Sequence, residues 1–260
     1  MNIKKYAERI NYPGELKPSL EVLCNLQKAH LLSVPFENLD IHYGNPIELD
    51  INKIFKKIIL NRRGGFCYEL NGLFFELLNS IGFKTKRISA KVFDEGKGYG
   101  PEYDHLAVIV TLDDIEYLTD VGFGEFTFGP LQLELGEIQN DERGNFVIDK
   151  TDGGYLKVSK VENGKSKPEY IFKNVHRNFT EFKEMCNYHQ TNSESHFTKQ
   201  RMISIPTKEG RITLTDKNLK ITVDDSIKET KLKNKDEFAK ALLDYFNIVI
   251  KQDYLNEKLN

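Results

Sequence analysis

The sequence predicts an α+β protein in which a helical part comes first, a strand-rich part follows, and both element types mix at the end. Two observations carry this prediction. Apolar residues recur at helical spacing up to about residue 82, and short alternating apolar runs separated by turn residues come after it. The length of 260 residues allows one large domain or two to three small ones. We expect three parts, at residues 1–82, 83–177 and 178–260.

The first part contains three stretches that each keep an apolar helix face. Residues 20–31 have a rough apolar helix face. Residues 51–59 have a clean one, and it follows Asp50, a residue type that caps helix N-termini. The third stretch, residues 68–81, places apolar side chains at Leu70, Leu73, Phe74, Leu77, Leu78 and Ile81. This spacing predicts a helix with one buried face.

The second part has the short alternating runs and turn residues of an antiparallel sheet. Asp113-Asp114, the stretch 152–154 and Asn163-Gly164 are hairpin-type turns. The expected strands are 86–93, 105–111, 115–121, 146–148 and 155–161.

The third part begins with the pattern of a capping box, Asn178 with Glu181, which predicts a helix to about Gln190. Short strands near 202–205, 211–215 and 220–223 follow it, and a closing helix is expected from about 235 to 251.

Composition excludes several classes of protein. The 37 basic and 39 acidic residues give a net charge of −2, so no footprint for nucleic acid is present. The N-terminus lacks the apolar core of a signal peptide, no run approaches membrane-spanning length, and no metal-binding spacing occurs. Three widely spaced cysteines fit a reducing compartment. We expect a soluble cytoplasmic protein without a metal.

Cys67 is the candidate nucleophile. It follows Gly64 and Gly65 and opens the predicted helix 68–81. Glycines before a helix let the chain turn sharply and let the backbone approach its neighbours closely. Unpaired N–H groups and the helix dipole at the first turn favour a negative charge, which lowers the pKa of a thiol there.

His105 and Asp120 are the candidate base and its orienting carboxylate. His105 opens one strand, and Asp120 lies near the end of the next. A two-residue turn at Asp113-Asp114 pairs residues whose numbers sum to 227, which places Asp120 on the same face as His105 and diagonal to it. An odd-length loop would separate the two. With Cys67, the pair would form a triad of the kind that activates a thiol.

A non-catalytic interpretation of each residue is also open. A lone cysteine is commonly a small buried apolar residue, as we expect for Cys24 and Cys186, which lie inside helical patterns. An aspartate before Gly-Phe-Gly is commonly a turn former. The catalytic interpretation is favoured because Cys67, His105 and Asp120 each lie at the end of an element.

Five segments together point to a known family, and the fifth, residues 192–198, agrees more weakly. The other four are Val34-Pro35-Phe36-Glu37-Asn38-Leu39, Arg63-Gly64-Gly65-Phe66-Cys67-Tyr68-Glu69-Leu70-Asn71-Gly72, Asp104-His105-Leu106 and Asp120-Val121-Gly122-Phe123-Gly124. In order and spacing they resemble the arylamine N-acetyltransferase family over nearly the whole chain.

The resemblance implies a helical bundle at 1–82, a β-barrel at 83–177 and an α/β lid at 178–260 around a papain- or transglutaminase-like Cys-His-Asp core. It implies transfer of an acetyl group from acetyl-CoA to Cys67 and then to an arylamine or arylhydrazine. It assigns Phe36, Val92 and Phe123 to the acceptor pocket. The candidates for contacts with CoA are Gly124, Phe197 and Thr198.

Two other residues of these motifs, Glu37 and Arg63, are expected to support the site. The positions lie close together in the family that the chain resembles, so we expect a partly buried ion pair that holds the turn before Cys67. The alternative is a pair of solvated charges worth at most ~1 kcal/mol.

Two other classes of function stay open. The same Cys-His-Asp set serves amide hydrolases and transglutaminase-like enzymes, and cleavage of a peptide or glutamine substrate would identify them. A non-catalytic binding module would lack a fast-reacting thiol.

Overall fold

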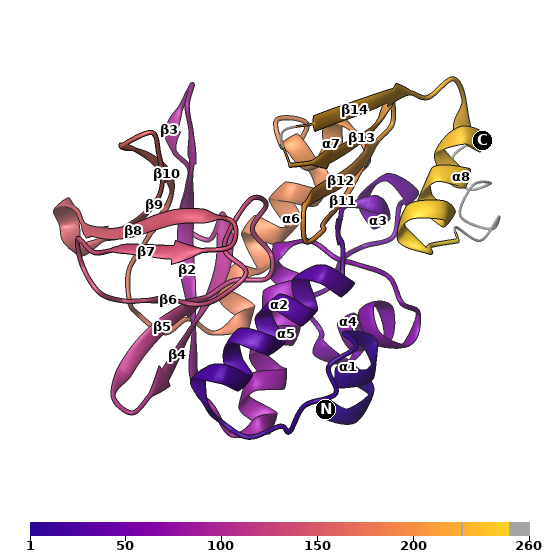
Figure 1. The fold of residues 1–260 in the computed structure, drawn as a ribbon. Helices are drawn as coiled ribbons and strands as arrows, with labels where there is room; N and C mark the ends of the chain where they lie inside the picture. Colours follow the sequence, from indigo (N-terminus) through magenta and orange to yellow (C-terminus); the bar gives the residue numbers. More distant parts are fainter. Residues whose placement is uncertain (225, 250–260) are drawn as a thin grey trace. The chain divides into compact units, whose positions relative to one another are not determined.

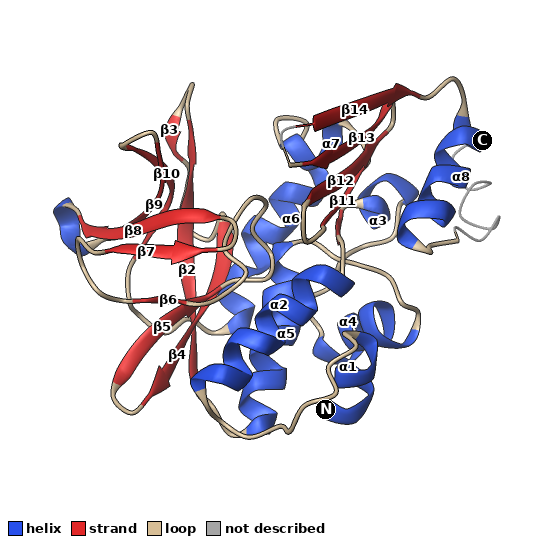
Figure 2. Cartoon of the chain, in the orientation of Figure 1, coloured by secondary structure: helices blue, strands red, loops and turns tan. Residues whose placement is uncertain are grey.

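A computed structural model describes residues 1–224 and 226–249 (Figure 1). Contacts within the chain group it into two compact units. The first comprises residues 1–30 and 67–185, and the second comprises residues 31–66 with the described residues from 186 onward. The division into parts at 1–82, 83–177 and 178–260 stays a prediction. Helices and strands are both abundant, as the α+β prediction requires (Figure 2).

The main helix of the first unit is α5 (Cys67–Ile81), which confirms the predicted helix at 68–81. Leu70, Leu73 and Phe74 on its apolar face are completely buried. The helix packs against the strands β2 (Lys84–Asp94) and β4 (His105–Leu112) and against α1 (Ile3–Arg9). Two further helices begin in this unit, α2 (Leu20–Ser33) and α6 (Lys183–Thr191), the latter after a 3-10 turn at Phe179–Phe182.

An antiparallel sheet in the first unit curls into a nearly closed barrel (Figure 1). Its strands run in the order β6-β5-β4-β2-β10-β9-β8-β7, with β3 paired to β2. The side chain of Gln139 on β7 joins the two edge strands, β6 and β7. It accepts a hydrogen bond from the Gln132 N–H on β6 and donates one to the Gln132 carbonyl, both 2.8 Å long. The bounds are β2 (Lys84–Asp94), β3 (Gly98–Tyr99), β4 (His105–Leu112), β5 (Ile115–Thr119), β6 (Leu131–Gln132), β7 (Ile138–Asp141), β8 (Gly144–Lys150), β9 (Leu156–Glu162) and β10 (Lys165–Phe172).

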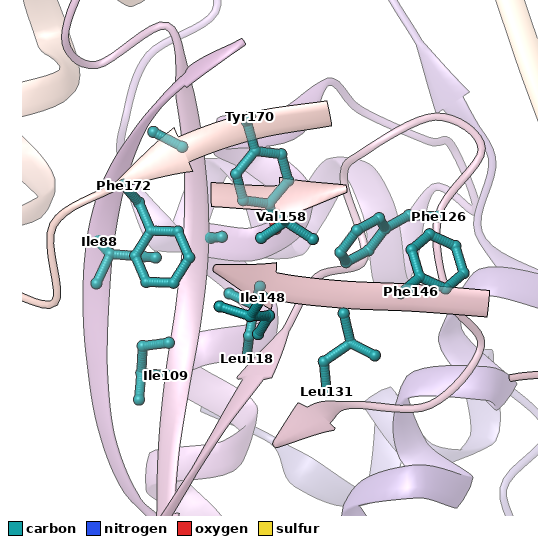
Figure 3. Close-up of a cluster of buried hydrophobic side chains, with 12 residues drawn as sticks. Ile88, Ile109, Leu118, Phe126, Leu131, Phe146, Ile148, Val158, Tyr170 and Phe172 are labelled. Carbon is teal, nitrogen blue, oxygen red and sulfur yellow. The ribbon is translucent and has the colours of Figure 1, made fainter. Parts of the chain in front are cut away.

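The barrel interior is a core of aliphatic and aromatic side chains (Figure 3). Burying apolar surface at about 25 cal/mol per Å² is the main stabilising term for such a core. The buried aromatic members are Phe146 on β8, Tyr170 and Phe172 on β10, and Phe126 in the loop between β5 and β6. Tyr170 is the one of these that also contacts the catalytic candidate His105, with ring centroids 5.5 Å apart.

The second unit is built on a five-stranded antiparallel sheet with the order β1-β11-β12-β13-β14. Its helix α8 (Lys235–Phe246) covers a core that includes Ile203, Leu214 and Leu242. The strands are β1 (Phe36–Glu37), β11 (Met202–Pro206), β12 (Gly210–Thr215), β13 (Asn218–Val223) and β14 (Ser226–Lys231). The helices are α3 (Leu39–Tyr43), α4 (Ile51–Phe55) with a π-helical turn at Lys56–Leu60, α7 (His196–Lys199) and α8 (Lys235–Phe246). Asp50 caps α4 as predicted, by accepting from the Asn52 N–H at 2.8 Å.

Some elements differ from the predictions. Strand β10 was not expected because Pro168 interrupts its pattern, and the structure accommodates that proline at a shift of register with β9. Strand β14 is an exposed edge strand without apolar alternation. The strand expected at 115–121 ends at Thr119. The last helix ends at Phe246, because Asn247 takes a left-handed backbone with φ of 53°; position 251 lies outside the described residues.

Across residues 1–224 and 226–249, no helix combines the length and the apolar character needed to cross a membrane.

Candidate functional site

Cys67 is the first residue of α5, and the residue is only 4% exposed. Neither Gly64 nor Gly65 takes a left-handed backbone, and Gly64 is required by close packing. A Cβ at Gly64 would lie 2.1 Å from the Pro35 carbonyl oxygen. Gly65 pairs with β1, where its carbonyl accepts from the Glu37 N–H at 2.9 Å. The segment that leads into the nucleophile is therefore held in an extended form.

The structure brings His105 and Asp120 together. The hairpin of β4 and β5 has the predicted register, with Val108 opposite Thr119. His105 Nε2 lies 2.6 Å from Asp120 Oδ2, and both side chains are buried. Because Nε2 donates to the carboxylate, Nδ1 is the ring nitrogen that is left to exchange a proton with a thiol.

Asp120 is fully buried, and its carboxylate is surrounded by donors. Burial alone would raise the pKa of Asp120, but the charge of His105 and the hydrogen bonds to the carboxylate outweigh this and hold the pKa below its usual value. Asp120 therefore stays ionised at neutral pH and stabilises the charged form of His105. The donors are His105 Nε2 at 2.6 Å, Asn71 Nδ2 at 2.8 Å, the Gly122 and Phe123 N–H groups at 2.9 and 3.0 Å, and the Tyr170 hydroxyl at 3.2 Å.

The segment that follows β5 lies against the first turn of α5. A Cβ at Gly122 would be 2.8 Å from Cys67 Cα, so only glycine fits there. Asn71 lies four residues after Cys67, on the same helix face. Its side chain reaches Asp120 and also accepts from the Val121 N–H at 2.9 Å. The helix face that carries Cys67 therefore also contacts the His105–Asp120 pair, through the hydrogen bond from Asn71 to Asp120.

Of the three proposed acceptor-pocket residues, Phe123 lies directly against His105, and Val92 lies opposite Tyr170. Phe123 is half-buried and presents its ring edge-on to His105, with centroids 5.2 Å apart. Val92 lies directly opposite Tyr170 in the pairing of β2 with β10, so the two share one face of the sheet. The third residue, Phe36, belongs to the second unit, where its ring lies 5.9 Å from that of Phe197.

The three candidates for contact with CoA differ in their surroundings. Gly124 faces open space, because a Cβ there would meet nothing within 4 Å. The Thr198 hydroxyl is engaged by the segment before it, since it lies 2.9 Å from the Asn192 carbonyl and 3.0 Å from the Ser195 carbonyl. Phe197 packs edge-on against Phe66 and His189, at 5.9 and 5.2 Å between centroids.

Glu37 and Arg63 belong to a partly buried cluster of charges in the second unit, in which Glu37 is the fully buried member. Arg63 Nε donates to Glu37 Oε1 at 2.9 Å, and its Nη2 lies 2.7 Å from the same oxygen and 3.0 Å from Asp40. Lys57 completes the cluster at 2.8 Å from Asp40. Burial would raise the pKa of Asp40, but Lys57 and Arg63 outweigh it and lower that pKa.

Sequence reasoning missed Asn71 and Tyr170, which both hydrogen-bond to Asp120. One signal for Asn71 was present, since it is a polar residue one helical turn after the nucleophile, on the same helix face. Nothing in the sequence around Tyr170 indicated its partner. In the described part of the chain, no group of three or more His, Cys, Asp or Glu side chains is placed to hold a metal ion.

Comparisons with known proteins agree along nearly the whole chain. A family model described as N-acetyltransferase matches residues 19–255. Human arylamine N-acetyltransferase 1 is 30% identical over 277 residues, covering 97% of this chain and 96% of the human protein. The structure of the Mycobacterium marinum arylamine N-acetyltransferase has a TM-score of 0.89 at 28% identity, covering 97% of this chain and 94% of that one. The Bacillus cereus arylamine N-acetyltransferase, described as having a unique Cys-His-Glu catalytic triad, has a TM-score of 0.89 at 25% identity and covers 96% of this chain and 100% of that one.

Proposed function

Because this chain belongs to the arylamine N-acetyltransferase family, we propose that it moves an acetyl group from acetyl-CoA to an aromatic amine or hydrazine through an acetyl-Cys67 intermediate. The observation that carries the proposal is the buried His105–Asp120 pair, whose carboxylate is also hydrogen-bonded by the helix that begins with Cys67. Asp120 stands here as the carboxylate of the proposed triad, in contrast to the glutamate described for the Bacillus cereus relative.

In the first step His105 takes the proton of the Cys67 thiol, and the thiolate attacks the thioester carbonyl of acetyl-CoA. The bond from that carbonyl to the CoA sulfur breaks, and CoA leaves with the proton from His105. The product is a thioester on Cys67, which keeps the acetyl group activated for the second step.

In the second step the nitrogen of the acceptor attacks the acetyl-Cys67 carbonyl. His105 removes a proton from that nitrogen, and the Cys67 thiolate leaves and recovers the proton. Asp120 orients the imidazole and stabilises its charged form through both steps. The net reaction yields an acetylated amine and free CoA, and it needs no metal.

Roles for the other residues belong to the same proposal. Phe36, Val92 and Phe123 would line the acceptor pocket, and the edge-on contact of Phe123 with His105 supports its place there. Gly124, Phe197 and Thr198 would contact CoA; the open space at Gly124 fits this role, whereas the internal hydrogen bonds of Thr198 leave it less free. Glu37 and Arg63 would support the segment that leads to Cys67. Three free cysteines fit a cytoplasmic location.

The test is CoA release from acetyl-CoA over a small panel of arylamines and arylhydrazines, with the wild type and Cys67→Ser. We expect CoA release that depends on the acceptor and is lost in the variant. Cleavage of a peptide or glutamine substrate without CoA release would instead assign the Cys-His-Asp set to an amide hydrolase or a transglutaminase-like enzyme.

A further inference from the structure

The helix that begins with Cys67 also holds the chain on both sides of His105. Tyr68, the residue after the nucleophile, is fully buried, and its hydroxyl lies 2.6 Å from the Tyr103 carbonyl and 3.2 Å from the Asp104 carbonyl. These two carbonyls belong to the two residues that precede His105. Asn71, one turn further along the helix, donates at 2.6 Å to the Leu106 carbonyl, which follows His105 directly.

The loop before His105 needs such support because Tyr103 has a positive φ of 66°. A bulky residue in this region is strained, and it stays there only where its surroundings fix it. The Tyr103 N–H donates to the Ser89 hydroxyl at 2.7 Å, and its own hydroxyl donates to Glu181 at 2.9 Å. The rings of Tyr68 and Tyr103 both pack against Phe182, at 5.8 and 5.2 Å between centroids.

Asn71 adds a second link, to the carboxylate itself. Its amide nitrogen donates to Asp120 at 2.8 Å, and its amide oxygen accepts from the Val121 N–H at 2.9 Å. The side chain is completely buried, so each of these bonds replaces one that water would otherwise make. The Asn71 side chain therefore connects helix α5, which begins with Cys67, to strand β4, which begins with His105, and to Asp120.

We propose that Tyr68 and Asn71 are positioning residues that set His105 and Asp120 in register with Cys67. The Tyr68 hydroxyl fixes the strained peptide before His105, and the Asn71 amide fixes the peptide after it together with Asp120. Neither residue touches a reacting atom in this role. The inference rests on the proposed function, since it concerns the same Cys67–His105–Asp120 site.

A displacement of about 1 Å at a catalytic group can cost a factor of about a hundred in rate. Loss of the Tyr68 hydroxyl or of the Asn71 amide would leave Cys67, His105 and Asp120 present, but their distances and orientations would vary more. The thiolate of Cys67 would then receive less help from His105, and its reaction with any electrophile would need a higher pH.

The experiment measures the rate at which iodoacetamide alkylates Cys67 as a function of pH, resolved by mass spectrometry of the Cys67 peptide. CoA release from acetyl-CoA is measured beside it. The variants are Tyr68→Phe, which removes one hydroxyl and keeps the ring, and Asn71→Ala. Tyr43→Phe is the matched control for the first, because it also loses a hydroxyl contact, the one with Arg201 in the second unit. Asn79→Ala is the control for the second, on the same helix but exposed.

We expect the alkylation profiles of Tyr68→Phe and Asn71→Ala to move to higher pH and CoA release to fall about tenfold to a hundredfold. The controls should match the wild type in both measurements. Loss of thermal stability without a change in the alkylation profile would show a structural role only and would overturn the proposal. If Asn71→Ala does not fold, the profile of Tyr68→Phe decides the matter.

Alkylation uses neither acetyl-CoA nor an amine, so the two proposals fail in different ways. A wild type that releases no CoA refutes the proposed function. Variant profiles that coincide with that of the wild type refute the positioning role.

Discussion

Replacing Arg63 by alanine should destabilise the protein far more than the loss of a surface charge would. The guanidinium makes two contacts to Glu37, at 2.9 and 2.7 Å, and one to Asp40 at 3.0 Å. Its side chain is 18% exposed, whereas that of Glu37 is 0% exposed. Without Arg63, the Glu37 carboxylate keeps the Leu39 N–H at 2.8 Å and a single cation, Lys57, at 3.9 Å, among the contacts that the structure gives it.

The size of the effect follows from the burial of Glu37. Removing one partner of a buried ion pair costs about 3–5 kcal/mol, because an uncompensated charge remains, whereas an exposed pair is worth about 0–1 kcal/mol. Lys57 offsets part of the loss, so we expect a value near the lower end, about 3 kcal/mol. For a chain of this size, each kcal/mol lowers the unfolding temperature by about 2–4 °C, which gives a fall of about 6–12 °C.

Thermal unfolding followed by circular dichroism measures this change, with Lys84→Ala, an exposed position on β2, as the control. The double variant Glu37→Gln with Arg63→Met should regain part of the loss, because it removes both charges together. CoA release should fall with stability in Arg63→Ala, because Arg63 directly precedes the glycines that lead to Cys67. An unfolding temperature equal to that of the wild type would show that the cluster acts as a surface contact and would refute this reasoning.

Three further predictions concern the Cys67 thiol, the Asp120 carboxylate and the half-buried carboxyl group of Glu169. Cys67→Ser should fold normally yet lose acetyl transfer by several orders of magnitude, because a hydroxyl lacks the nucleophilicity of a thiolate; Cys24→Ser and Cys186→Ser should keep most activity, and equal loss in all three would contradict the assignment. Asp120→Asn should move the alkylation profile of Cys67 upward, toward an ordinary thiol with a pKa of about 8.5, and an unchanged profile would show that Asp120 is not coupled to the thiol. Burial raises the pKa of Glu169 from 4.5 to about 7, so its protonated form contributes stability that is present below about pH 4.5 and is lost as the pH rises through about 7. Glu169→Gln should therefore raise the unfolding temperature at about pH 8 and leave it unchanged at about pH 4, whereas a gain of equal size at both would contradict the assigned burial.

The His105–Asp120 contact could be predicted because it depends on a local hairpin. Asp113 and Asp114 both take a left-handed backbone, with φ of 48° and 62°, as a tight two-residue turn requires. Such a turn fixes the register of the two strands, and the register decides which side chains share a face. The pairing of Val108 with Thr119 then follows from residue numbers alone.

The helix of the nucleophile could be predicted for a similar reason. Its apolar positions repeat over four turns, and this periodicity is strong in a single segment of sequence. The function of the glycines before it was only partly predicted. Gly64 is required by the closeness of the Pro35 carbonyl, a contact between segments 29 residues apart in number, and not by a left-handed turn.

The remaining contacts of the site could not be read from the sequence because they join distant segments. Asn71 meets Leu106, Asp120 and Val121 across separations of 35, 49 and 50 residues. Tyr170 lies on a strand that its own pattern did not reveal, because Pro168 interrupts it. Likewise, the Glu37–Arg63 pair was anticipated from motif positions, but the contributions of Asp40 and Lys57 emerged only from their packing.

Trapping the acetylated enzyme tests the central claim most directly. The protein is incubated with acetyl-CoA alone, its mass is measured intact, and the modified peptide is identified. We predict one acetyl group per chain, located on Cys67, released together with one acetylated product when an arylamine is added, and absent in Cys67→Ser. Turnover of acetyl-CoA and arylamine without an acetylated Cys67, or with the acetyl group on another residue, would contradict the account.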